Sequence, residues 1–348
     1  MPARLARHPV AWVAGGIGLG VAGRALWRRL RAIDLRGQVV VITGSSRGLG
    51  FAMAQEFARK SARLVICARN EGALEQARRA LVNQGAQVLA VPCDVRDCEQ
   101  ARHLIDQATA RFGRVDVLVN NAGTIMTGPI WEQTLPDLEE AMETMFWGTV
   151  YTTIAALPQM RERKSGRIVN ITSLGGKVSV PHLLPYCSAK FAAVGFSEGL
   201  HAELAKDGIA VTTVVPGLMR TGSHVNAIFK GRHRAEYTWF SLGASLPVTA
   251  MSARRAARQI VRAAQRGDTE IMLGLETQVL VRLAGLFPGT TTQALGLVNR
   301  LLPKEGGVGQ ERRRGWESET RLSQSFLTTL GQRAAQQYQR HLETIAKE

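Results

Sequence analysis

The chain has 348 residues, 45% of them hydrophobic, a composition that excludes a disordered protein and fits one enlarged α/β domain or one domain with extensions. The net charge is +16, but arginines are spread over the whole sequence without an aromatic-interleaved basic stripe, which argues against nucleic-acid binding. The four cysteines lack CxxC spacing and nearby histidines, so we expect small buried hydrophobes in a reducing compartment and no metal site; they are Cys67, Cys93, Cys98 and Cys187.

Residues 1–36 form a basic and apolar N-terminal segment with seven arginines and one acid. The uncharged run from Pro9 to Gly23 is 15 residues long, shorter than the roughly 20 that a bilayer requires, and Arg24 ends it. No small-residue cleavage site follows the run, which argues against a signal peptide. We therefore expect residues 9–27 to form a membrane anchor or interfacial helix, or else a helix packed on this protein or a partner subunit. If they span a bilayer, the arginines after them keep the main domain in the cytoplasm, the expected location with or without membrane attachment.

From Gly37 onward, short apolar runs alternate with helical stretches. The expected strands are 39–44, 63–68, 87–94, 115–123, 166–173, 209–217 and 269–274. Continuous apolar strands separated by helices predict a parallel sheet that is buried on both faces. The fold class is therefore a doubly wound α/β sandwich of the Rossmann type, in which ligands bind at the carboxyl ends of the strands.

The second half of the chain is less regular. Residues 217–250 form a long connection with few regular signals, which is typical of a lid or binding loop. Beyond the last strand lie two amphipathic or interfacial stretches, a polar tail from Lys304 and a helix near the C-terminus. We accordingly divide the chain into the N-terminal segment 1–36, a Rossmann-fold catalytic domain 37–275, and a partly helical extension 276–348.

The sequence TGSSRGLG at 43–50 joins the first strand to the first helix. Its glycines allow the backbone to turn sharply and approach a pyrophosphate on the positive end of the helix, although a plain strand-to-helix turn is the alternative. The turn places Gly44, Ser46, Arg47, Gly48, Leu49 and Gly50 in a candidate cofactor site.

The end of the second strand bears on the choice of dinucleotide. A ribose-reading acid would mark NAD, but the sequence there runs Cys67, Ala68, Arg69, Asn70. Because arginine can accept a 2′-phosphate, Arg69 favours NADP(H) over NAD(H), and Arg47 adds a second positive charge. Asp94 follows the third strand and is a candidate acceptor for the adenine amino group, with Val95 beside it; solvent exposure is the alternative for each of these side chains.

The helix that begins near residue 184 carries Tyr186 and Lys190. Residues four apart lie on one helix face, so the ammonium can lie beside the phenol and favour its ionised form. Such a tyrosine could exchange protons near neutral pH. The alternative is a tyrosine with its hydroxyl at the surface and an exposed lysine.

Five motifs occur in register: TGSSRGLG, NNAG (120–123), Ser173 thirteen positions before Tyr186, YCSAK (186–190) and PG (216–217). Together they resemble the short-chain dehydrogenase/reductase family over residues 37–275. The resemblance implies that Tyr186 is the general acid or base, that Lys190 lowers its pKa and holds the nicotinamide ribose, and that Ser173 hydrogen-bonds the substrate oxygen. It also implies a cofactor wall with the remaining residues Asn121, Ala122, Gly123, Pro216, Gly217 and Thr221.

One position departs from the family pattern. The family usually has an asparagine three residues before a glycine on its fourth helix, and here Met145 stands three before Gly148. That asparagine helps hold a water that links the lysine to solvent, and a thioether is only a weak acceptor. Either a water held by backbone carbonyls keeps the enzyme active, or the protein is a catalytically weak or inactive dinucleotide-binding sensor or scaffold at a membrane.

The expected substrate is a small lipophilic carbonyl or alcohol, because the predicted cleft walls are largely apolar. They comprise Leu174, Val178, Val180, His182, Leu183, Leu184, Met219, Ile228, Phe229, Tyr237, Trp239 and Phe240. His182 has no partner pattern, so we expect it on the surface of a loop. The family resemblance further implies a homo-oligomer formed through the fourth and fifth helices.

Overall fold

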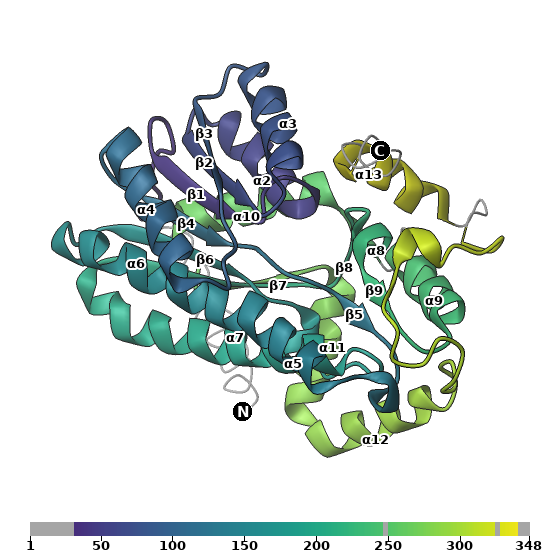
Figure 1. Ribbon diagram of the computed structural model, residues 1–348. Helices are drawn as coiled ribbons and strands as arrows, with labels where there is room; N and C mark the ends of the chain where they lie inside the picture. Colours follow the sequence, from purple (N-terminus) through teal and green to yellow (C-terminus); the bar gives the residue numbers. More distant parts are fainter. Residues whose placement is uncertain (1–30, 246–249, 324–327, 340–348) are drawn as a thin grey trace, which may run out of the picture.

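The computed structural model describes residues 31–245, 250–323 and 328–339. A seven-stranded sheet with the order β3-β2-β1-β4-β6-β7-β11 lies at its centre (Figure 1), and every neighbouring pair is parallel. The strands are β1 (Val39–Thr43), β2 (Arg63–Ala68), β3 (Val88–Pro92), β4 (Val117–Asn120), β6 (Gly166–Ile171), β7 (Ile209–Pro216) and β11 (Glu270–Leu273). The predicted doubly wound α/β fold is confirmed.

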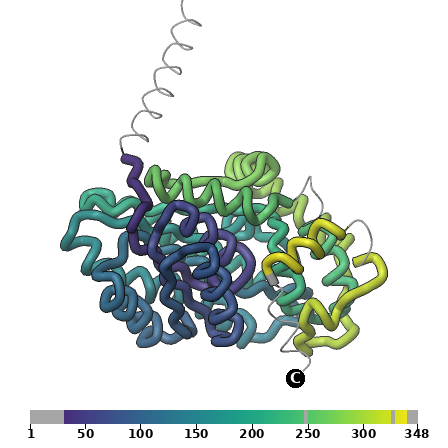
Figure 2. The backbone as a smooth tube through the Cα atoms, turned by 90° about the horizontal axis from the view of Figure 1, so that it is seen from above, coloured from purple at the N-terminus to yellow at the C-terminus, as the bar shows by residue number. Residues whose placement is uncertain are grey.

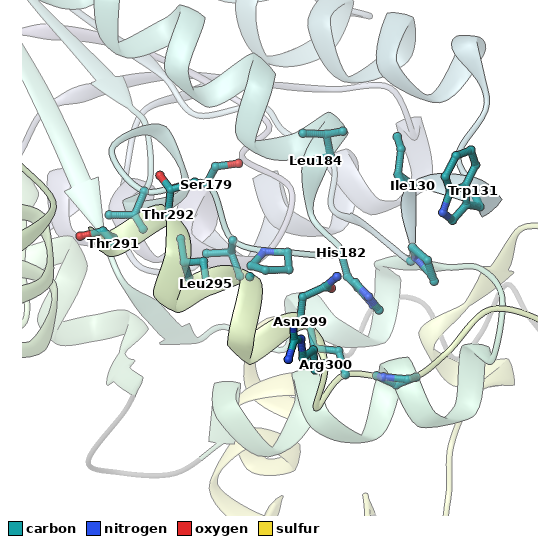
Figure 3. A pocket seen from close by; sticks show the side chains of 18 of the residues that line it. Ile130, Trp131, Ser179, His182, Leu184, Thr291, Thr292, Leu295, Asn299 and Arg300 are labelled. Atoms are coloured by element: carbon teal, nitrogen blue, oxygen red, sulfur yellow. The ribbon is translucent and has the colours of Figure 1, made fainter. Parts of the chain in front are cut away.

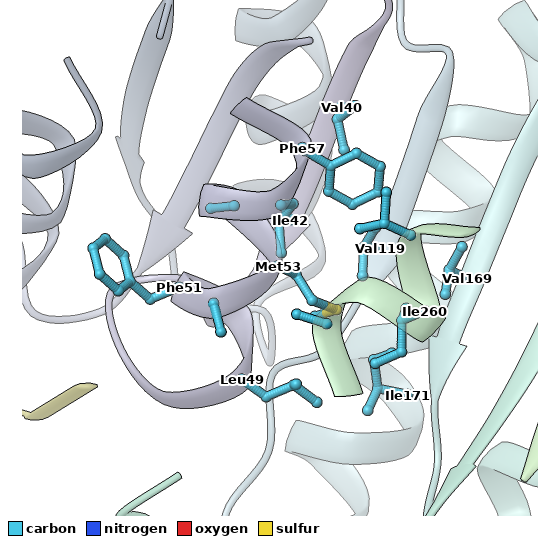
Figure 4. Packing of buried hydrophobic residues seen from close by; sticks show 14 of the residues in the cluster. Val40, Ile42, Leu49, Phe51, Met53, Phe57, Val119, Val169, Ile171 and Ile260 are labelled. Carbon is cyan, nitrogen blue, oxygen red and sulfur yellow. The ribbon is translucent and has the colours of Figure 1, made fainter. Parts of the chain in front are cut away.

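Helices cover both faces of the sheet (Figures 1 and 2). One face carries α2 (Gly48–Ala58), α3 (Glu71–Val82) and α10 (Ala253–Arg266), and the other carries α4 (Cys98–Phe112), α6 (Gly148–Glu162) and α7 (Leu184–Leu204), with α5 (Leu135–Met142) packed on α7. In Figure 4, Met53 and Phe57 of α2 and Ile260 of α10 pack against the strand residues Ile42 and Val119. Because both faces are covered, each strand is a continuous apolar run.

Residues 217–250 are more regular than the sequence suggested. They contain β8 (Leu218–Arg220), α8 (Ser223–Asn226), β9 (Ile228–Phe229), α9 (His233–Ser245) and the start of β10 (Ala250–Ser252). The buried positions of α9 have helical spacing, but Glu236 and Ser241 are among them. Polar residues on the buried face conceal the apolar periodicity on which a helix prediction depends.

The C-terminal extension folds back over the carboxyl edge of the sheet (Figure 1). It contains α11 (Leu275–Leu286), α12 (Pro288–Asn299), β12 (Arg313–Arg314) and α13 (Thr329–Gln339). Strand β12 pairs antiparallel with β9, which pairs in turn with β5 (Met126–Thr127). The extension therefore completes a small sheet beside the carboxyl edge of the main one.

A buried ionic cluster centred on Asp137 of α5 holds the extension in place. The Asp137 carboxylate accepts hydrogen bonds from Lys230 and from Arg312, whose Nη2 lies 2.7 Å from Oδ1. Burial alone would raise the pKa of Asp137, but the hydrogen bonds from Lys230, Thr134 and Arg312 outweigh it and lower the pKa. The carboxylate is therefore ionised at neutral pH and joins three distant segments of the chain.

Three of the four predicted buried cysteines are buried, and no described helix is suited to span a membrane. Cys67, Cys93 and Cys187 are buried as expected, but Cys98 is exposed, because it is the first residue of α4 and faces solvent. Within the described ranges, no helix combines the length and apolarity that crossing a bilayer requires. The predicted membrane segment 9–27 lies outside the described residues.

Candidate active site

A cleft of about 350 Å³ lies at the carboxyl ends of the central strands. Its walls include every residue that the sequence assigned to catalysis or cofactor binding: Gly44, Ser46, Arg47, Gly48, Leu49, Gly50, Arg69, Asp94, Val95, Asn121, Ala122, Gly123, Ser173, Tyr186, Lys190, Pro216, Gly217 and Thr221. These residues come from seven separate parts of the chain, and the parallel sheet brings them together because its strands end at the same edge.

The glycine turn and the end of β4 are in direct backbone contact. Gly44 has φ +61°, and a Cβ atom there would lie 2.8 Å from Ala122 Cα. The Asn121 side-chain amide donates to the carbonyl oxygens of Thr43 and Gly44 at 2.9 and 3.0 Å. Asn121 therefore holds the turn against β4, and a residue with a side chain at position 44 would separate them.

The N-terminus of α2 borders the cleft without a side-chain cap, because Arg47 at the N-cap position makes no such hydrogen bond. Uncapped amide groups and the positive end of the helix dipole favour an anionic group at this place. The residues present therefore fit the pyrophosphate of a dinucleotide.

Three arginines gather at one end of the cleft. Arg47 donates through Nη1 to the Asn226 side-chain oxygen at 3.2 Å, and Arg314 donates through Nη1 to the Asn226 backbone oxygen at 3.2 Å. Burial lowers the pKa of Arg47, and the charges of Arg314 and Arg69 lower it further. Sequence reasoning missed Arg314 and Asn226, because Arg314 reaches the cleft only through the pairing of β12 with β9.

Asp94 lies in the cleft wall with its carboxylate engaged by a neighbour. Arg96 donates to Asp94 Oδ2 at 2.6 Å through Nη2 and at 3.0 Å through Nε. Burial alone would raise the pKa of Asp94, but the Arg96 hydrogen bonds outweigh it and lower the pKa. Val95 is in close contact with Gly148, where a Cβ atom would lie 2.7 Å from Val95 Cγ2. Its apolar side chain therefore fixes the distance between this wall and α6.

Tyr186 and Lys190 lie in the first two turns of α7, beside Ser173. Lys190 donates from Nζ to the Ile171 carbonyl oxygen at 2.8 Å, and this Nζ lies 5.9 Å from the centre of the Tyr186 ring. Burial lowers the pKa of Lys190 to about 8. Burial also raises the pKa of Tyr186 to about 12, although a hydrogen bond with Ser173 acts in the opposite direction.

The expected lowering of the Tyr186 pKa by Lys190 is therefore not what the structure shows. Both groups lose solvation, and loss of solvation disfavours the charged form of each. The phenol keeps its proton at neutral pH, which suits a group that donates a proton.

A chain of buried hydrogen bonds fixes α7 to the central sheet. Asn120 donates through Nδ2 to Asn170 Oδ1 at 2.9 Å, and Asn170 donates through Nδ2 to the Ser197 hydroxyl at 3.0 Å. The Ser197 hydroxyl in turn hydrogen-bonds Thr213 at 2.7 Å. The helix that carries Tyr186 is thus tied to β4, β6 and β7 at once.

His182 is not a surface residue, and that expectation was wrong. Its Nδ1 atom lies 2.7 Å from Glu236 Oε1, and the two side chains are 7% and 0% exposed. The other Glu236 oxygen accepts from Trp239 Nε1 at 2.7 Å. The partner lies in α9, 54 positions away, so no local pattern could have identified it.

Of the residues predicted to line the substrate cleft, Met219 does so, but most of the others lie elsewhere. Leu183, Phe229, Tyr237 and Phe240 pack on one another in a small core beneath the site. Val178, Val180, His182 and Leu184 instead line a second cavity of about 1220 Å³ beside α12. The open apolar wall next to Tyr186 is therefore smaller than expected.

Comparison with known proteins agrees with this geometry. A family model described as short chain dehydrogenase matches residues 38–229. The chain belongs to the short-chain dehydrogenase/reductase family. Membership makes it an oxidoreductase of the dehydrogenase/reductase type.

Two curated relatives illustrate the similarity. The chain is 32% identical to dehydrogenase/reductase SDR family member 7B of Danio rerio, over 79% of this chain and 90% of the relative. It is 37% identical to 11-beta-hydroxysteroid dehydrogenase A of Sesamum indicum, over 68% of each chain.

Solved structures extend the comparison. A short-chain dehydrogenase/reductase from Burkholderia phymatum in complex with NAD matches with a TM-score of 0.69 and 26% identity, over 74% of this chain and 96% of that one. A variant actinorhodin polyketide ketoreductase with NADPH matches with a TM-score of 0.62 and 30% identity, over 68% and 96%.

In this short-chain dehydrogenase/reductase, Met145 lies on a π-helical turn, η2 (Glu143–Trp147). It is 1% exposed, packs with Ala141, Ala189 and Tyr186, and is not part of the cleft wall. The neighbouring Thr144 does line the cleft, and its buried hydroxyl has no hydrogen-bond partner among the described residues. Sequence reasoning missed Thr144, because no motif marks it, and adjacent helical residues point in different directions.

Replacing Met145 with Asn should not raise turnover. The amide would enter an apolar cluster instead of the cleft, and burying it without partners costs about 1–3 kcal/mol. We expect urea denaturation to show that loss while turnover stays equal or falls. Met145→Leu, which conserves volume, is the matched control and should change neither quantity greatly. A large gain in rate for Met145→Asn would contradict this and show that the natural residue limits catalysis.

Proposed function

We propose that the protein is an NADP(H)-dependent oxidoreductase that interconverts a lipophilic carbonyl and the corresponding primary or secondary alcohol. The observation that carries the proposal is the convergence of Ser173, Tyr186 and Lys190 with the glycine turn in one cleft. A nicotinamide dinucleotide, when bound, would supply or accept the hydride.

In this proposal Tyr186 moves the proton. During reduction its hydroxyl donates a proton to the carbonyl oxygen, and during oxidation the phenolate takes the proton back. The raised pKa keeps the proton on the phenol until a developing alkoxide, a stronger base, is within reach. Ser173, already hydrogen-bonded to the phenol, would donate to the same substrate oxygen and orient it.

Lys190 is the group that would return a proton to Tyr186. Its amine is anchored to the Ile171 carbonyl, and Lys190 lines the cleft, where its remaining N–H groups could donate. With a pKa of about 8, the amine exchanges protons easily at neutral pH. It can therefore restore the proton of Tyr186 and hydrogen-bond the nicotinamide ribose.

The charge of the cleft supports NADP(H) over NAD(H). Arg47, Arg69 and Arg314 surround the place at the end of β2 where a 2′-phosphate would lie. Arg69 stands where an enzyme that prefers NAD would carry an acid for the ribose hydroxyls. Amide groups at the start of α2 would hold the pyrophosphate, and Asp94 would meet the adenine amino group in competition with Arg96. Pro216, Gly217 and Thr221 would lie near the nicotinamide.

The second cavity supports a lipophilic substrate. It borders the start of α7, where Leu184 lies two residues before Tyr186, and Val178 and Val180 contribute to its apolar wall. One curated relative is named as a hydroxysteroid dehydrogenase, and a hydroxysteroid is a largely apolar alcohol. Assembly into a homo-oligomer through α6 and α7 is part of the proposal, and the exposed Ile154 and Phe191 on these helices favour it.

Replacing Tyr186 with Phe should remove the proton donor and lower turnover of a lipophilic carbonyl by about 100- to 10,000-fold. Binding of NADPH, followed by fluorescence, should change little. Tyr151→Phe on α6 is the matched control, because that tyrosine lies outside the cleft and stacks on Trp147. Unchanged turnover in Tyr186→Phe would refute the mechanism. Cofactor binding without any turnover in the natural protein would instead favour the non-catalytic sensor.

Fluorescence titration with NADPH and NADH should separate the two cofactors. NADPH should bind the natural protein more tightly, and Arg69→Ala or Arg314→Ala should each weaken it about tenfold, the value of one charged hydrogen bond. NADH binding should stay nearly constant. Arg79→Ala is the control, because Arg79 is exposed on α3 and pairs only with Glu75 among the described residues. Equal affinity for both dinucleotides, or binding of neither, would contradict the cofactor assignment.

A further inference from the structure

The hairpin formed by α11 and α12 exposes large apolar side chains on its outer side. Leu275, Leu283 and Leu286 recur at helical spacing along α11, and Phe287, Leu297 and Leu301 continue the surface. Leu286 is 71% exposed and Leu301 is 86% exposed. Many large exposed apolar side chains on two adjoining helices mark an interaction site, since isolated exposed leucines are ordinary but groups of them are not.

The inner side of the same hairpin is already in use. Thr277 of α11 is fully buried against the body of the protein, and Thr291 and Leu295 of α12 line the second cavity. Figure 3 shows these α12 side chains across the cavity from His182 and Leu184. The apolar outer side is therefore a separate face, without any partner among the described residues.

The charges of the hairpin decide what can cover this face. Residues 275–305 contain three bases, Arg282, Arg300 and Lys304, and two acids, Glu276 and Glu305. The Glu276 carboxylate folds back over Gly274, where a Cβ atom would lie 1.9 Å from Oε1. Among the described residues none of the three bases pairs with a carboxylate, and Arg300 and Lys304 lie at the cavity wall. Arg282 lies four residues before Leu286 on α11, so this base adjoins the apolar face, while Arg300 and Lys304 lie on the cavity side of the hairpin.

We propose that the α11–α12 hairpin docks on an anionic lipid surface, with its apolar side chains inserted and its bases at the headgroups. An amphipathic helical surface with basic residues binds an interface in this way. A second copy of the chain fits less well, because the bases of the hairpin outnumber its acids and a two-fold contact would bring the bases of both copies together. The net charge of +16 favours approach to an anionic surface as well.

Docking would turn the second cavity toward the lipid. Residues of α12 form one wall of that cavity, and Leu184 on another wall precedes Tyr186 by two residues. Entry of a lipophilic substrate by this route rests on the proposed function, whereas docking itself does not.

A fluorescent reporter on the hairpin tests the proposal in the full-length protein. We would attach the polarity-sensitive dye NBD to Leu286→Cys in a Cys98→Ser background, because Cys98 is the exposed cysteine of the described chain. The matched control carries the dye at Gln84→Cys, an exposed position after α3. Each protein is mixed with vesicles of phosphatidylcholine alone or with 30 mol% phosphatidylserine, roughly the composition of an anionic leaflet.

The proposal expects a blue shift at position 286 with anionic vesicles, a much weaker one with neutral vesicles, and none at position 84. Replacing Arg282 and Arg300 with Gln should weaken the response about fivefold for each base removed. Co-sedimentation without a shift at 286 would mean that another segment binds the lipid and would overturn the proposal. A shift that grows with protein concentration in the absence of vesicles would overturn it in favour of a second copy. Since no carbonyl is reduced in this experiment, its outcome is independent of the proposed chemistry.

Discussion

Burial of the Tyr186 and Lys190 pair against the end of β6 is the constraint on which the rest of the site depends. Neither side chain is well solvated, so the phenol holds its proton and the amine exchanges one near neutral pH. Their positions follow from α7, which the Lys190 hydrogen bond to Ile171 and the Ser197 network fix to the sheet. Because α7 is fixed at Lys190 and again at Ser197, it cannot rotate without breaking buried hydrogen bonds. Leaving a buried donor or acceptor unpaired is energetically unfavourable.

The C-terminal extension contributes a charged residue to the cofactor cleft of the Rossmann core. Asp137 joins α5, the segment after β9 and Arg312 through a buried cluster, and β12 begins at the residue that follows Arg312. That connection places Arg314 beside Arg47 in the cofactor cleft. The positive charge of the cleft thus depends on a segment more than 240 positions distant from Arg69 in the sequence.

The parts of the fold that could be predicted are those that depend on residues close together in the sequence. Seven apolar runs gave seven strands, and the glycine turn and Asn121 meet because parallel strands end at one edge. What could not be predicted depends on distant or polar partners. Helix α9 buries Glu236, which hides its periodicity and pairs with His182, and Arg314 reaches the cleft through a two-residue strand. The pKa of Tyr186 was predicted in the wrong direction, because residue spacing indicates a nearby charge but not the burial of both groups.

Transfer of deuterium from C4-deuterated NADPH to a panel of apolar ketones and aldehydes tests the central claim most directly. If this cleft performs dehydrogenase/reductase chemistry on a lipophilic carbonyl, mass spectrometry should find one deuterium on the carbon that bears the new hydroxyl, at natural rates only when Tyr186 is present. Tight NADPH binding with no labelled alcohol from any member of the panel would contradict that claim.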